Sequence, residues 1–134
     1  MDIPLRVGQY ALLTNPDGKL LVLKRTRSEK WSLPGGRLEP DERDWLDALK
    51  REIEEEANID IEEAQPYKVN IVEDLPHQIK YCVYFQVKLK NDVEVKLTEE
   101  HSAFLWIDKN NCDTIEFEYP FVQKLVAEYL KEKI

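Results

Sequence analysis

The chain has 134 residues, of which 43% are hydrophobic, and its formal net charge is −8 at pH 7. This is enough apolar material for one folded domain over residues 1–134, and it argues against an intrinsically disordered chain. No apolar run approaches the ~18 residues of a membrane span, and the acidic balance argues against non-specific binding to nucleic acid, which needs a basic surface.

The cysteines indicate a reducing compartment. Cys82 and Cys112 are thirty positions apart and fit no metal-binding or redox spacing. We expect both to be reduced thiols, with Cys82 packed inside a strand. The first six residues lack the basic and then apolar pattern of a signal peptide, so we expect a cytoplasmic protein.

The N-terminal third predicts short strands joined by turns. Residues 5–14 are mostly apolar and lead into Asn-Pro-Asp-Gly at 15–18, in which proline fixes one φ and glycine supplies a positive φ. Residues 19–25 are apolar again, so the two segments predict a hairpin. Residues 31–33 predict a short extended piece, and Pro-Gly-Gly at 34–36 predicts a break in regular structure.

Residues 44–57 predict the clearest helix. Apolar side chains recur there at helical spacing and form one stripe. The stripe consists of Trp45, Leu46, Leu49, Ile53 and Ala57. Asp44 suits the N-cap, although Asp41 also fits, and Asn58 stands where a left-handed C-cap is expected.

The second half alternates between strands and a final helix. Residues 67–73, 79–89 and 105–107 predict strands, and Pro120 predicts the first turn of a C-terminal helix. The buried stripe of that helix would be Phe121, Val122, Leu125, Val126 and Tyr129. Strands and helices do not alternate regularly, so we predict an α+β fold: a mixed sheet with helices on its faces.

The predicted helix 44–57 carries an acidic arc beside its apolar stripe. Glu52, Glu55 and Glu56 lie at positions i, i+3 and i+4, where like charges repel by about 0.2–0.5 kcal/mol per pair. A divalent cation would offset this repulsion, and Mg²⁺ prefers carboxylate oxygens. Gly35 and Gly36 let a backbone carbonyl reach a metal, or let N–H groups approach phosphate. Taken alone, a glutamate-rich helix is more often a solvent-exposed face.

The glycines and the acids together resemble the signature of the Nudix hydrolases, G-x5-E-x7-R-E-U-x-E-E-x-G-U, where U is apolar. The matching positions are Gly36, Glu42, Arg51, Glu52, Ile53, Glu55, Glu56 and Ile59. There are two departures: eight residues instead of seven separate Glu42 from Arg51, and Asn58 replaces glycine. The flanks are similar too, with residues 31–36 before the signature and 99–107 after it.

The resemblance implies a Nudix-type α/β/α sandwich around a mixed sheet. It also implies a cofactor, Mg²⁺ or Mn²⁺, bound by Glu52, Glu55, Glu56 and the carbonyl of Gly35. Glu42 would bind a further metal or steady the loop. The resemblance also places Arg51 among the catalytic residues. We expect Arg51 to act by pairing with Glu42, which would hold the loop, and not by touching the substrate.

The reaction also needs a base and contacts to the substrate. A general base must lie within hydrogen-bond reach of the attacking water, and the candidates are Glu52 and Glu100, with Glu99 beside it. Arg25 and Gly36 are candidates to contact substrate phosphate. For Arg25, Glu99 and Glu100 the alternative is an ordinary solvent-exposed charge.

The leading interpretation is divalent-metal-dependent hydrolysis of a nucleoside diphosphate linked to another moiety, most directly a nucleoside triphosphate. ADP-ribose and dinucleoside polyphosphates are alternative substrates, and a non-catalytic nucleotide sensor is an alternative of another class. An RNA-binding or decapping module would need a basic groove that the sequence does not reveal. A homodimer would use an exposed strand such as residues 81–86.

Overall fold

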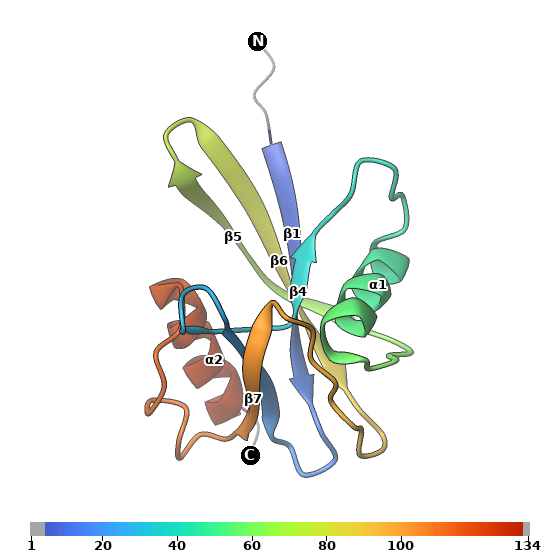
Figure 1. The fold of residues 1–134 in the computed structure, drawn as a ribbon, viewed down its shortest axis with the longest axis vertical. Helices are drawn as coiled ribbons and strands as arrows, with labels where there is room; N and C mark the ends of the chain where they lie inside the picture. Colours follow the sequence, from blue (N-terminus) through green and yellow to red (C-terminus); the bar gives the residue numbers. More distant parts are fainter. Residues whose placement is uncertain (1–4, 133–134) are drawn as a thin grey trace.

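A mixed β-sheet lies between two helices in the computed structural model, which describes residues 5–132. Figure 1 shows α1 on one side of the sheet and α2 on the other. The elements are β1 (Leu5–Thr14), β2 (Leu20–Arg25), β3 (Trp31–Ser32), β4 (Gly35–Arg37), α1 (Trp45–Ala57), β5 (Gln65–Leu75), β6 (Gln78–Lys88), β7 (His101–Ile107) and α2 (Pro120–Glu132). No helix within residues 5–132 is both long and apolar enough to cross a bilayer.

The sheet contains one parallel pair among antiparallel ones. Its strand order is β3-β2-β1-β6-β5, with β4 paired to β1 and β7 paired to β2. β1 and β6 run parallel from Leu5 opposite Ile79 to Thr14 opposite Lys88, whereas the other pairs are antiparallel. The predicted α+β class with a mixed sheet is therefore confirmed.

The predicted hairpin of the first two strands is correct at its turn only. The N–H of Gly18 donates to the carbonyl of Asn15 at 2.9 Å, and Gly18 has a φ of 79°. β1 and β2 are in register at Thr14 and Leu20. β2 then pairs with β7, while β1 pairs with β4 and β6.

The predicted break at residues 34–36 is correct at Pro34, which lies between β3 and β4, but wrong at the glycines, because Gly35–Arg37 form β4 against β1. Gly35 lies opposite Tyr10, and Gly36 lies opposite Gln9. Gly35 has a φ of 147°, and a Cβ there would lie 2.1 Å from the carbonyl oxygen of Gln9. The glycines thus allow a close strand approach that a larger residue would prevent.

The strand proposed for a homodimer is not an edge. β6 lies between β1 and β5, and residues 81–86 pair on both sides. Their backbone groups are used within the sheet, so this expectation is wrong.

The helix α1 begins and ends as predicted. Its N-cap is Asp44, whose side chain accepts a hydrogen bond from the N–H of Asp47 at 2.9 Å. Its C-cap is Asn58, with φ 60° and ψ 34°, and the N–H of Asn58 donates to the carbonyl of Glu54 at 2.9 Å. Asn58 therefore takes the left-handed geometry expected of the glycine in the signature.

The two helices bury slightly different stripes from those predicted. The buried residues of α1 are Ala48, Leu49, Ile53 and Ala57. Trp45 is 45% exposed and stacks on Phe85 with ring centroids 4.9 Å apart. In α2, Phe121 is 39% exposed, so its predicted burial is wrong. Both aromatic rings lie at the margin of a helix–sheet contact rather than in its centre.

Two apolar cores result, one on each face of the sheet. Alternate residues of β1 and β2 contribute to each, as expected for a strand buried on both faces. Leu12 and Val22 belong to the core beneath α2, and Leu13 and Leu23 belong to the core beneath α1. Cys82 is a buried thiol in β6, as predicted.

We expect Asn58→Val to lower the free energy of unfolding by about 1–2 kcal/mol, because a β-branched side chain is strained in the left-handed region. Asn58→Gly is the matched control, and its stability should stay within about 0.5 kcal/mol of the wild type, since glycine tolerates this geometry. Urea denaturation followed by circular dichroism measures both. Equal midpoints for the two variants would contradict the role of Asn58 as the cap.

Candidate active site

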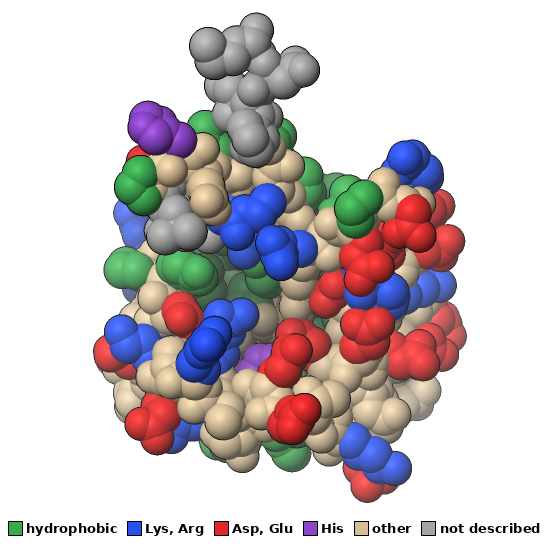
Figure 2. All heavy atoms as spheres, turned by 45° about the horizontal axis from the view of Figure 1, so that its top comes forward, with side chains coloured by type: hydrophobic (Ala, Val, Ile, Leu, Met, Phe, Trp, Pro, Cys, Tyr) green, Lys and Arg blue, Asp and Glu red, His purple; other side chains and the backbone are tan. Residues whose placement is uncertain are grey.

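A cavity of about 450 Å³ opens beside β4, between the acidic face of α1 and the start of α2. Its acidic lining residues are Glu52, Glu56, Glu100 and Glu118. Its basic lining residues are Arg6, Arg25, Arg37 and Lys80. Its aromatic lining residues are Tyr10, Trp31, Tyr84, Tyr119 and Phe121. Figure 2 shows a hollow bordered by both acidic and basic side chains.

The glycines of β4 hold two of the helix acids against the sheet. The N–H of Gly35 donates to Oε1 of Glu56 at 2.7 Å. A Cβ on Gly36 would lie 2.1 Å from Oε2 of Glu52. Both predicted glycines therefore lie at the site, and both line the cavity. Gly35 contacts an acid through its N–H here, and its expected use as a carbonyl ligand stays a prediction.

Burial strongly perturbs the acid next to Gly35. Burial raises the pKa of Glu56 to about 8; the Gly35 N–H opposes this change, and the charges of Glu52 and Glu100 add to it. Burial likewise raises the pKa of Glu52. At neutral pH the metal-free protein therefore holds a proton on Glu56 that a bound cation would displace.

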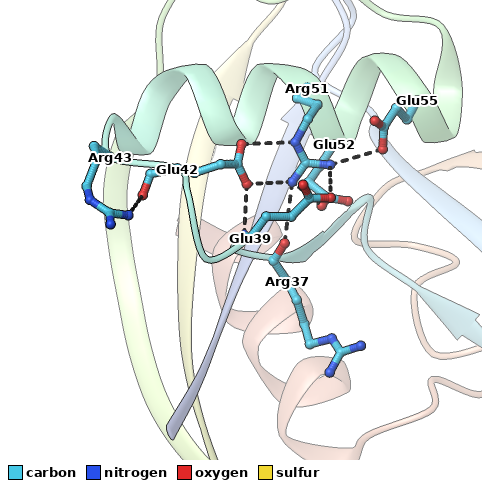
Figure 3. Close-up of polar contacts among 7 residues, drawn as sticks. All are labelled: Arg37, Glu39, Glu42, Arg43, Arg51, Glu52 and Glu55. Atoms are coloured by element: carbon cyan, nitrogen blue, oxygen red, sulfur yellow. Dashed lines mark hydrogen bonds and ion pairs between the residues drawn. The ribbon is translucent and has the colours of Figure 1, made fainter.

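Arg51 joins the loop before α1 to the acids on the helix (Figure 3). Its Nε and Nη2 donate to the two carboxylate oxygens of Glu42 at 2.9 and 2.7 Å, and Nη2 also donates to Oε1 of Glu52 at 2.7 Å. The predicted pairing of Arg51 with Glu42 is confirmed. Arg51 keeps the pKa of Glu42 below its ordinary value.

The extra residue between Glu42 and Arg51 does not disturb this pairing. Residues 43–50 separate Glu42 from Arg51, and the first two of them, residues 43 and 44, precede α1. The loop is held independently, because the N–H of Glu39 donates to Oε1 of Glu42 at 2.9 Å. The added length is therefore absorbed outside the contact.

The three acids of the predicted arc separate into two groups. Glu52 and Glu56 line the cavity, as the metal-ligand prediction requires. Glu55 is an exposed residue outside the cavity lining, and its Oε2 accepts a hydrogen bond from Nη1 of Arg51 at 3.1 Å. The three acids share one face of the helix, but in this structure the side chain of Glu55 is turned toward Arg51 and away from the cavity.

The segment before β7 contributes one of its two predicted acids. Glu100 lines the cavity, whereas the side chain of Glu99 is exposed and lies outside the cavity lining. The carbonyl of Glu99 accepts a hydrogen bond from Oγ1 of Thr26 at 2.9 Å, so Glu99 supports the loop through its backbone.

Arg25 also lies where the sequence predicted, at the cavity, with its Nη1 3.3 Å from Oε2 of Glu118. Trp31 packs against the core beneath α2 and lines the cavity as well.

Sequence reasoning missed the wall opposite α1. Lys80 and Tyr84 in β6, Arg6 and Tyr10 in β1, and Asn70 in β5 all line the cavity. A signal was present, because residues 80, 82 and 84 must share one face of a strand. Which face meets the acids depends on the strand order, and the chain does not reveal that order locally.

The donor set fits a divalent cation. Its cavity-facing members are carboxylate oxygens, the ligands that Mg²⁺ and Mn²⁺ accept. The space over Glu52 exists because residue 36 has no Cβ. Burial is the main cause of the raised pKa of Glu56, and the charges of Glu52 and Glu100 add to it; a cation would relieve this added repulsion.

We expect the metal-free protein, kept in EDTA, to lose stability as pH rises from 6 to 8. The folded state binds the Glu56 proton more tightly than the unfolded state, so this stabilisation is complete below the ordinary pKa of 4.5 and is lost as pH rises through about 8. The slope is at most about 1.4 kcal/mol per pH unit. Urea denaturation at each pH should show the slope in wild type and in Glu54→Gln, and a flatter one in Glu56→Gln. An unchanged slope in Glu56→Gln would contradict this assignment.

Comparisons with known proteins agree with this arrangement. The family model for the NUDIX domain matches residues 4–127. An RNA pyrophosphohydrolase of Pelagibacter ubique (strain HTCC1062) is 28% identical over 151 aligned residues, which cover 98% of this chain and 95% of that protein. An asymmetrical bis(5'-nucleosyl)-tetraphosphatase of Sus scrofa is 33% identical over 108 residues, which cover 73% of this chain and 69% of that protein.

The fold agrees as well. The crystal structure of the MutT protein from Methanosarcina mazei Go1 superposes with a TM-score of 0.83 at 24% sequence identity, covering 99% of this chain and 98% of that one. The Nudix-type fold implied by the signature is thereby confirmed. This chain belongs to the NUDIX family and is a Nudix pyrophosphohydrolase.

Proposed function

We propose that residues 1–134 form one domain that hydrolyses a nucleoside triphosphate at a pyrophosphate bond, with Mg²⁺ or Mn²⁺ as cofactor. The observation that carries this proposal is the pair Glu52 and Glu56, which β4 holds at a cavity that also contains basic side chains. Acids suited to a cation and cations suited to phosphate meet in one space. Cys82 and Cys112 are not joined in a disulfide, which supports a cytoplasmic location.

In this proposal Glu52 and Glu56 hold the cation, and Glu55 joins them once its contact with Arg51 is released. The carbonyl of Gly35 is a further candidate ligand. The chemistry that a divalent cation supplies in such sites is charge neutralisation on phosphate oxygens and a more acidic water.

The protein's own residues would bind the substrate and accept the proton. Glu100 is the proposed general base, because its carboxylate is exposed at the cavity. Glu52 is the second candidate, although Arg51 already binds one of its oxygens. Arg25 would contact substrate phosphate, and Arg51 would act as a positioning residue by fixing Glu42 and Glu52.

The aromatic wall supports a nucleoside as part of the substrate. Tyr10 and Tyr84 stack with ring centroids 5.7 Å apart, and Phe121 lies 5.8 Å from Tyr84. Of these three rings only Phe121, at 39% exposed, is well open to solvent, and an aromatic ring at a cavity can stack on a base, whatever its identity. The hydroxyl of Tyr84 donates to Oδ1 of Asn70 at 3.0 Å, which fixes the orientation of that polar residue in the lining.

A dinucleoside polyphosphate is the second candidate substrate. It is favoured by the number of cations around the cavity, where Arg6, Arg37 and Lys80 join Arg25 despite the overall charge of −8. The name of the Sus scrofa relative points the same way. A 5'-polyphosphate end of RNA, suggested by the name of the Pelagibacter ubique relative, belongs in the same substrate panel.

We expect Glu56→Gln to lower the turnover of nucleoside triphosphates by about a hundredfold or more, because it removes a charged ligand oxygen. Glu54→Gln on the exposed side of α1 is the control and should stay within about twofold. Phosphate and pyrophosphate release is measured with Mg²⁺ and then Mn²⁺, and calorimetry measures Mn²⁺ binding. Full activity in Glu56→Gln would contradict the proposal. If the wild-type protein binds nucleotides but hydrolyses none of them, the non-catalytic nucleotide sensor is favoured instead.

We expect Lys80→Met to raise KM about tenfold for substrates with three or more phosphates, with a smaller effect on ADP-ribose, because a charged contact to the distal phosphate is lost. Lys68→Met, on the neighbouring strand and outside the cavity, is the control. An equal change in KM for every substrate would show that Lys80 does not distinguish substrates by the number of their phosphates.

A further inference from the structure

His101 adds a nitrogen to the acidic side of the cavity. It is the first residue of β7 and is 5% exposed. A ring nitrogen of His101 and carboxylate oxygens of Glu56 and Glu100 all lie within 4.8 Å of one another. Three ligand atoms at that spacing can reach one cation.

The imidazole of His101 lacks the contacts of an ordinary core histidine. Its Nδ1 is buried without a hydrogen-bond partner in the described part of the chain. Buried polar atoms are nearly always paired, so an orphaned one in a native structure indicates an absent water or ion.

The backbone around this group is fixed. The N–H of His101 donates to the carbonyl of Thr98 at 3.3 Å, and the carbonyl of Glu100 accepts from the N–H of Thr26 at 2.9 Å. Glu56 is held from the other side by the N–H of Gly35. An irregularity between Lys24 and Arg25 sets His101 opposite Arg25. The three side chains therefore converge from α1, from the turn before β7 and from the first residue of β7.

We propose that Glu56, Glu100 and His101 form a mixed nitrogen and oxygen site that selects a first-row transition cation, such as Mn²⁺, over Mg²⁺. Imidazole suits transition metals, whereas Mg²⁺ prefers an all-oxygen shell. The inference rests on the proposed function because the two share Glu56 and Glu100. Glu56 would bring this cation next to the one held with Glu52, and a Glu100 bound to this cation would leave Glu52, the second candidate, as the general base.

The chain has two histidines, which makes the test direct. His77 lies in the turn between β5 and β6 and is exposed. Electron spin echo envelope modulation on tag-free protein loaded with Mn²⁺ detects an imidazole nitrogen bound to the ion. We expect the ¹⁴N signal in wild type and in His77→Gln, where His101 is the remaining histidine. Its absence from His77→Gln would overturn the inference, and no variant at the buried position is needed for that result.

Calorimetry gives the second readout. His101→Gln should weaken Mn²⁺ binding by at least about tenfold and change Mg²⁺ binding by less than about threefold. Equal losses for both cations in a folded variant would contradict selection by nitrogen. A nitrogen signal without nucleotide hydrolysis would support this site and overturn the proposed activity. Hydrolysis without the nitrogen signal would support the proposed activity and overturn this site.

Discussion

The site depends on one close approach: the glycines of β4 lie directly against the acids of α1. Gly35 donates its N–H to Glu56, and the missing Cβ of Gly36 leaves room for Glu52. Two carboxyl groups are thus held partly out of water, which costs free energy and raises the pKa of both. Such a cost is typical of a functional site, where local strain or charge is kept for chemistry.

The charge of this region is organised around Arg51. Its guanidinium binds Glu42 with two hydrogen bonds and also pairs with Glu39, Glu52 and Glu55, so one cation is shared by four acids. The planar fork of arginine makes this sharing possible. Because the contact is made by a long side chain across a loop, an added residue before the helix does not break it.

The cavity is electrically mixed, although the chain as a whole is acidic. Acids reach it from α1 and from the segments before β7 and α2, and cations reach it from β1, β2, β4 and β6. A cation bound to the acids would leave a predominantly positive lining, which suits a polyanionic substrate. Net charge predicted weak non-specific contact with nucleic acid; it carried no information about this enclosed surface.

The sequence by itself determined the helix 44–57 with its caps at Asp44 and Asn58, the acidic arc and the family, because these features rest on contacts within a few residues. The tertiary structure decided that Gly35–Arg37 is a strand, that Glu55 turns to Arg51, and that His101, Lys80 and Tyr84 meet the acids. Those outcomes depend on which strands are neighbours and in what register. That arrangement is set by the packing of the whole sheet between its two helices, not by any local pattern of residues.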